Sequence, residues 1–96
     1  MKYYKRGFLN SGEGMAAFES NVEYDTEYAG ASIDANFKIS DCNRQVSLDF
    51  YCYNDNDYEG AMFKLDTLAA ELKEFGKKLK AANQQRIKAK ASNEQA

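Results

Sequence analysis

Three consecutive segments of the chain alternate apolar and polar side chains with a period of two residues. They run from about Met15 to Asp25, from about Ala31 to Ser40 and from about Arg44 to Tyr53. Because successive side chains of a β-strand point to opposite faces, each segment predicts a strand with one apolar and one polar face. Such strands are typical of an antiparallel sheet that packs on a core with one side and faces water with the other.

The connections between these segments are short and contain residues that favour turns. Residues 25–30 end in a glycine, and residues 41–43 read Asp-Cys-Asn, types that tolerate turn conformations. Residues 2–9 predict a further, less regular strand, because Gly7 interrupts its pattern. A loop at residues 10–14 would join it to the next strand. Connections of this length favour a meander, in which strands adjacent in the chain are adjacent in the sheet.

After residue 54 the apolar period changes from two residues to about 3.6. The motif Asn54-Asp55-Asn56-Asp57 marks this change and supplies side chains that cap helices. Two helix starts fit the pattern, a long helix capped by Asp57 and a shorter one capped by Asp66. The apolar stripe of this helix consists of Ala61, Leu65, Leu68, Ala69, Leu72, Phe75, Gly76, Leu79 and Ala82, with Met62 at its edge.

These patterns together predict an α+β fold of the order ββββα. We expect an antiparallel three- to four-stranded β-meander with one long C-terminal α-helix packed on one face of the sheet. A chain of 96 residues has room for one such core. We therefore expect a single α+β domain over residues 1–82. Residues 83–96 lack the apolar stripe, and we expect them to form a basic, polar helix end or tail.

The chain carries no sequence signal for a membrane or for secretion. No apolar run approaches the roughly 20 residues of a membrane span, and no apolar segment follows the basic start of the chain. We therefore expect a cytoplasmic protein. Its two cysteines, Cys42 in a turn and Cys52 on the apolar side of a strand, lack CxxC spacing and are interpreted as reduced thiols rather than as a disulfide or redox pair.

The residues needed for common catalytic and metal sites are few. Histidine is absent, which removes the commonest general base and metal ligand. Cys42 is the only exposed nucleophile that the pattern suggests, and Asp41 is no substitute for an imidazole. Counted from Asp55, an EF-hand loop needs Glu at the twelfth position, where the chain has Asp66. We expect no enzymatic activity, no cofactor and no metal site.

Charge is distributed unevenly between the two parts of the chain. Residues 1–59 contain 11 acidic and 5 basic residues, whereas residues 60–96 contain 4 acidic and 8 basic ones. Such asymmetry can mark an interaction surface. On the polar face of the predicted sheet, Asp25 adds to the acidic residues and Lys38 opposes them. The residues that we predict to bind a protein there are Glu19, Glu23, Asp34, Asp49, Tyr51 and Tyr53.

The favoured function is a small, non-enzymatic protein-binding module. An acidic face with tyrosines suits a partner with a basic surface, such as the groove of a nucleic-acid-handling protein. The size of the chain and its lack of catalytic groups suit an inhibitor of the kind that phages and mobile elements carry. A homodimer formed through a sheet edge, as in a structural homo-oligomer, is one alternative. The other is nucleic-acid binding through basic helix residues, namely Lys77, Lys78, Lys80, Arg86, Lys88 and Lys90.

Overall fold

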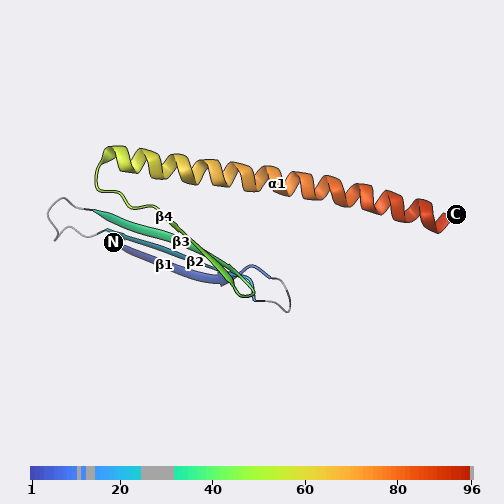
Figure 1. Cartoon of the computed structure of the whole chain (residues 1–96), viewed down its shortest axis with the longest axis horizontal. Helices are drawn as coiled ribbons and strands as arrows, with labels where there is room; N and C mark the ends of the chain where they lie inside the picture. Colours follow the sequence, from blue (N-terminus) through green and yellow to red (C-terminus); the bar gives the residue numbers. More distant parts are fainter. Residues whose placement is uncertain (11, 13–14, 25–31, 96) are drawn as a thin grey trace. The chain divides into compact units, whose positions relative to one another are not determined.

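Four antiparallel strands and one helix follow one another along the chain. The computed structural model describes residues 1–10, 12, 15–24 and 32–95. The strands are β1 (Lys2–Phe8), β2 (Ala17–Tyr24), β3 (Ile33–Asp41) and β4 (Arg44–Asp49), and the helix is α1 (Asp55–Gln95). The sheet has the order β1-β2-β3-β4, so it is a meander with β1 and β4 at its edges (Figure 1). The predicted ββββα fold class is confirmed.

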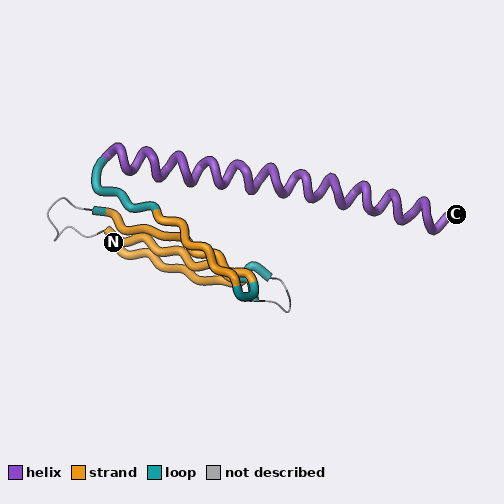
Figure 2. Tube along the Cα trace, viewed as in Figure 1, coloured by secondary structure: helices purple, strands orange, loops and turns teal. Residues whose placement is uncertain are grey.

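The observed strands begin and end close to the predicted ones. β4 is shorter than predicted. After Asp49 the pairing with β3 continues through a hydrogen bond from the Phe50 N–H to the Ala35 carbonyl and through an isolated bridge between Cys52 and Ile33. The predicted connection at residues 25–30 and the predicted strand residues Asp25 and Ala31 lie outside the described residues. Figure 2 separates the strands from the helix by colour and shows the four strands running side by side.

The strand register places the apolar residues of neighbouring strands on one face. Phe18 in β2 is opposite Ile39 in β3, which is opposite Val46 in β4. The Phe18 and Phe37 rings stack nearly parallel, with their centroids 6.2 Å apart. Aromatic pairs of this kind add to the stability gained from burial alone. These rings are half-buried, so contacts between strands cover much of their surface.

Gly7 leaves space for one of these rings. It is opposite Phe18 in the β1–β2 pair, and a Cβ atom at this position would lie 2.7 Å from the ring. The sequence pattern suggested only that Gly7 weakens the first strand. The structure gives it a packing role, because a residue without Cβ allows the aromatic ring across the strand to lie over the backbone.

The β3–β4 hairpin turns through two residues, Cys42 and Asn43, between the paired Asp41 and Arg44. Cys42 has a φ angle of 55°, in the left-handed region that glycine and asparagine adopt more readily than other residues. The predicted turn is therefore present. The residue with positive φ is the cysteine rather than the neighbouring asparagine.

The motif at residues 54–57 forms the N-terminus of α1. The Asn54 side-chain oxygen accepts a 2.8 Å hydrogen bond from the Asp57 backbone N–H, as an N-cap residue does. In return, the Asp57 carboxylate accepts a 3.1 Å hydrogen bond from the Tyr53 backbone N–H, much as in a capping box. The long helix is therefore the observed one. Its cap is Asn54, and Asp57 is the reciprocal partner rather than the cap.

The helix continues well past its apolar stripe. It is 41 residues long and includes residues 83–95, for which a short extension followed by a tail was expected. The chain divides into two compact units, Met1–Met62 and Phe63–Ala96. The packing of the helix on one face of the sheet stays a prediction, as does the domain boundary at residue 82.

No helix in the described part of the chain has a segment apolar enough to cross a membrane.

Candidate protein-binding face

The polar face of the sheet is a grid set by the strand register. One row across all four strands contains Lys2, Glu23, Asp34 and, continuing past the end of β4, Tyr51. The next row contains Tyr4, Asn21, Asn36 and Asp49. The third contains Arg6, Glu19, Lys38 and Ser47. Five of the six predicted binding residues therefore share this face.

The third row of the grid has mixed charge. Glu19 is directly opposite Arg6 on one side and Lys38 on the other, and the three residues line a shallow hollow. Cross-strand neighbours of opposite charge attract each other. Glu19 therefore lies between two basic residues in the register, which makes it a weaker candidate for binding a basic partner than its carboxylate alone suggested.

Sequence reasoning missed the two basic residues that β1 adds to this face. Lys2 is opposite Glu23, and Arg6 is opposite Glu19. The alternation of the first strand is poor, so its pattern did not show which of its side chains share a face with the acidic residues. Only the strand pairing shows that Lys2 and Arg6 belong to this face, because the register with β2 decides which residues of β1 lie beside the acidic residues.

The other end of the face is acidic. We call Glu23, Asp34, Asp49 and Tyr51 the acidic corner. Glu23 and Asp34 are direct cross-strand neighbours, an arrangement in which like charges repel. Lys2 is opposite Glu23 on its other side, so Asp34 is the carboxylate of this pair that has no basic residue directly opposite it in the register. Asp34, followed by Asp49, raises the pKa of the Tyr51 phenol above its ordinary value of 10.0, and burial and Tyr53 add to the rise. Negative charge at this corner thus disfavours a further negative charge on the tyrosine.

A pair of asparagines separates the acidic corner from the mixed-charge row. The Asn21 side-chain amide donates a 3.1 Å hydrogen bond to the Asn36 side-chain oxygen in the neighbouring strand. The same amide approaches the Glu19 carboxylate at 3.3 Å. Both asparagines are half-buried. These bonds fix the middle row of the grid, so the acidic corner is presented from a hydrogen-bonded sheet rather than from a loop.

Two predicted features of the acidic face lie outside the grid. Tyr53 follows the last bridge of the sheet and is 67% exposed, and its backbone N–H is held by Asp57. Tyr53 thus lies beyond the paired part of the sheet. Its phenol is close to the acidic corner, because it contributes to the raised pKa of Tyr51. Asp25 lies outside the described residues.

The basic residues of the alternative site surround the helix. At about 100° per residue, Lys77, Lys80 and Lys88 fall on one side of α1, whereas Lys78, Arg86 and Lys90 point in other directions. All six are exposed. Lys78 forms a 3.7 Å ion pair with Glu74, and Arg86 donates a 3.0 Å hydrogen bond to Asn83. The helix therefore does not offer all six of these basic residues to any one strand of nucleic acid. Lys77, Lys80 and Lys88 lie together, and Lys73 falls on the same side.

The remaining chemical groups have structural roles in the described residues. Cys42 is exposed in its turn, and the buried Cys52 thiol donates to the Phe50 carbonyl at 3.4 Å. No group of three metal-ligating His, Cys, Asp or Glu side chains is found among the residues that the structure describes.

In comparisons with known proteins, no family model, no curated protein and no solved structure matched the chain.

Proposed function

We propose that this protein is a non-enzymatic binding module that recognises a basic protein surface through the acidic corner of its sheet. One observation carries this proposal. The strand register brings Glu23 and Asp34 into direct opposition and places Asp49 and Tyr51 next to them. Leaving like charges adjacent costs stability, and a partner with lysine or arginine side chains would relieve that cost.

The chemistry of the acidic corner suits this kind of partner. Carboxylates accept charge-assisted hydrogen bonds from lysine and arginine, and bind arginine through two parallel bonds. Tyr51 and Tyr53 are exposed and can add contact area together with a polar tip, as tyrosines do in protein interfaces. Such a face would compete with phosphates for the basic groove of a nucleic-acid-handling protein. Inhibition of such a protein, as by a phage or mobile-element product, is the form of this function that we favour.

The test compares a pair of carboxylates in the acidic corner with the single carboxylate of Glu19 in the mixed-charge row of the same face. The probe is a fluorescent peptide of about ten Lys and Arg residues, titrated with the full chain and followed by anisotropy at about 50 and 200 mM salt. Asp34→Asn combined with Asp49→Asn should weaken binding strongly. Glu19→Gln is the matched control and should change binding little, since Arg6 and Lys38 already compensate that carboxylate. Equal losses from both variants would show that general negative charge, rather than the corner, binds the probe.

The second candidate function is nucleic-acid binding by the helix, favoured by the three lysines on one side of α1. Labelled single-stranded DNA, duplex DNA and RNA serve as probes under the same conditions. Binding that falls by orders of magnitude between the two salt concentrations indicates contacts to several phosphates. If replacing Lys77, Lys80 and Lys88 with Gln abolished that binding while the acidic-corner variant retained it, the helix would be the site and the first proposal would fail.

A further inference from the structure

The apolar stripe of α1 follows a heptad repeat. Between residues 61 and 82 the apolar residues recur at alternating intervals of four and three, through three heptads. Leucine occupies each a position of the repeat, and alanine, leucine or phenylalanine occupies each d position. A seam of this length is typical of a helix that packs against another helix. Its members are Ala61, Leu65, Leu68, Leu72, Phe75, Leu79 and Ala82.

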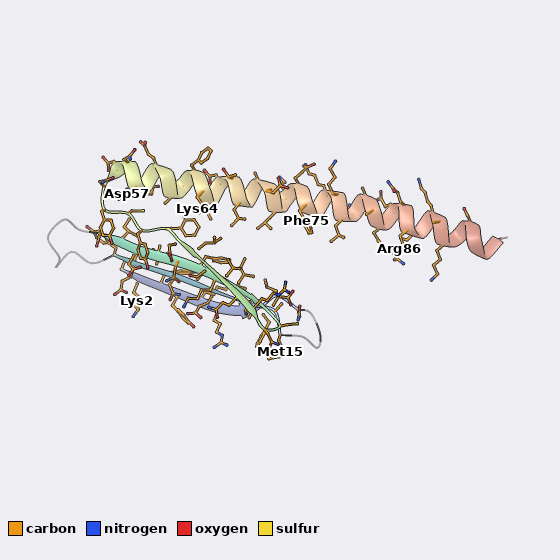
Figure 3. All side chains as sticks on the ribbon, viewed as in Figure 1. Lys2, Met15, Asp57, Lys64, Phe75 and Arg86 are labelled. Atoms are coloured by element: carbon orange, nitrogen blue, oxygen red, sulfur yellow. The ribbon has the colours of Figure 1, made fainter. Side chains whose placement is uncertain are left out.

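The large side chains of this seam are exposed. Leu72, Phe75 and Leu79 are 58%, 63% and 62% exposed, and Figure 3 shows the Phe75 side chain projecting from α1. Lysine and glutamate occupy much of the rest of the helix surface. An apolar seam bordered by charged residues marks an interaction surface. The charges beside the seam indicate which partner fits it.

We propose that this partner is a second copy of the chain and that two α1 helices pair antiparallel through residues 61–82. The apolar residues of the seam also match one another when the second helix runs in the opposite direction. Leu72 then packs against Phe75 of the second copy, Leu68 against Leu79, and Leu65 against Ala82. Each large residue of the seam meets another apolar residue, as the alternating a and d layers of an antiparallel coiled coil require.

Charge complementarity selects this register and this orientation. Glu71 and Lys78 occupy successive g positions beside the seam, and the register above brings Glu71 of each copy next to Lys78 of the other. A shift by one heptad would instead place Glu71 against Glu71, or Lys78 against Lys78. In a parallel pair, Glu71 would face Gly76 and Lys78 would face Asn83, with no ion pair formed. Flanking charges set helix orientation in this way.

The other side of the seam has small residues where the two helices would meet. In the antiparallel register Ala69 of one copy lies beside Gly76 of the other. Glycine weakens a helix interior, and a Cβ atom on Gly76 would meet nothing within 4 Å in the single chain. Among the residues that the structure describes, no contact therefore accounts for glycine at this position. Close approach by the backbone of a second helix does account for it.

Lys78 also has a partner within its own helix. Its ammonium lies 3.7 Å from the Glu74 carboxylate, and the two side chains are 79% and 50% exposed. Surface pairs of this kind are weak, so Lys78 can turn towards Glu71 of a second copy at little cost. Glu74 lies away from the seam, at a c position of the repeat, which makes it the natural control residue.

The experiment measures dimer dissociation of the full chain by sedimentation velocity. Wild-type protein should be a dimer. Glu71→Lys and Lys78→Glu should each raise the dissociation constant about tenfold, because two attractive pairs become two repulsive ones. Combining both substitutions should restore a dissociation constant close to wild type. Glu74→Lys removes the pair within the helix but leaves the seam intact, and should leave the dissociation constant unchanged.

Two results would overturn the proposal. One is a monomer at about 100 µM chain, a concentration that populates dimers of even modest affinity. The other is a dimer whose dissociation constant in both single reversals equals that of the wild type, which would place the interface elsewhere, for example at the β4 edge. Circular dichroism of each variant checks that α1 is intact, and all three substitutions affect exposed side chains.

Discussion

The apolar side chains of the sheet and of the helix differ in how much of their surface is buried. In the sheet, Phe18 and Phe37 are half-buried by each other and by neighbouring strands, and Ala35 is buried. In α1, Leu72 and Phe75 are more than half exposed. The inner strands β2 and β3 have a neighbouring strand on each side, about 5 Å away, whereas these large helix side chains are mostly exposed. The sheet thus gains stability from contacts between its strands, and the helix has an exposed apolar surface.

The strongest test of this contrast makes the same substitution in both regions. Phe37→Ala should lower the free energy of unfolding of the sheet by about 2 kcal/mol, the low end for a large-to-small change because the ring is only half-buried. Phe75→Ala should leave the urea midpoint of the sheet unchanged when the protein is dilute enough to be monomeric. Tyrosine fluorescence reports the transition, since most tyrosines lie outside α1. Equal losses would mean that the helix covers the sheet of its own chain, as the sequence predicted.

The second test uses two glycines. Gly7→Ala should destabilise the sheet by about 1 kcal/mol, because the new methyl group displaces the Phe18 ring. Gly60→Ala, in α1, should instead stabilise the protein by up to about 1 kcal/mol through higher helix propensity, since a Cβ atom there meets nothing within 4 Å. Urea denaturation measures both. If Gly7→Ala stabilised the protein as Gly60→Ala is expected to do, Gly7 would have no specific role in packing Phe18.

A smaller effect is expected at the β3–β4 turn. Cys42→Gly should raise the free energy of unfolding by about 0.5 kcal/mol, because glycine adopts the observed positive φ without strain, a gain partly offset by its greater flexibility when unfolded. Cys42→Ala is the control. It removes the thiol but keeps the Cβ atom, so it should give no gain. A gain from alanine would attribute the effect to loss of the thiol instead of to the backbone.

The smallest effect tests the acidic corner by titration. Asp34→Asn should bring the pKa of Tyr51 closer to its ordinary value, and Asp49→Asn should do so less, following the order of their influence. Glu19→Gln, two rows away, should have no effect. Carbon NMR of the tyrosine ring measures each pKa. Since folding raises this pKa, the stability that the proton contributes is complete below pH 10.0 and is lost as the pH rises through the folded-state value.

The part of the fold that the sequence predicted best is the part with regular periodicity. β2, β3 and the long helix follow from alternation and from the apolar stripe, and the strand register confirms which residues of β2 and β3 share a face. The side chains of β1 were not, since Gly7 and two adjacent tyrosines break its pattern and only the register with β2 assigns Lys2 and Arg6 to the acidic face. The division of that face into an acidic corner and a mixed-charge row could not be predicted either, because it depends on the same register.

Other features depend on contacts that a single sequence does not show. Cysteine is not a residue type associated with positive φ, so its place in the β3–β4 turn had no signal. The cap at Asn54 and its partner Asp57 were suggested as a set, but their roles were decided by hydrogen-bond geometry. The helix extends through residues 83–95 without an apolar stripe, because alanine, lysine and glutamine are good helix formers by themselves.

The meander order of the strands also bears on how the chain folds. Every strand pairs only with its neighbours in sequence, so no pairing has to wait for a distant segment. The β3–β4 hairpin closes through two residues, the smallest loss of chain entropy among the three pairings. We expect it to form first, with β2 and then β1 adding to its free edge. Local pairing of this kind gives a low contact order, and the sheet should fold quickly for a β structure.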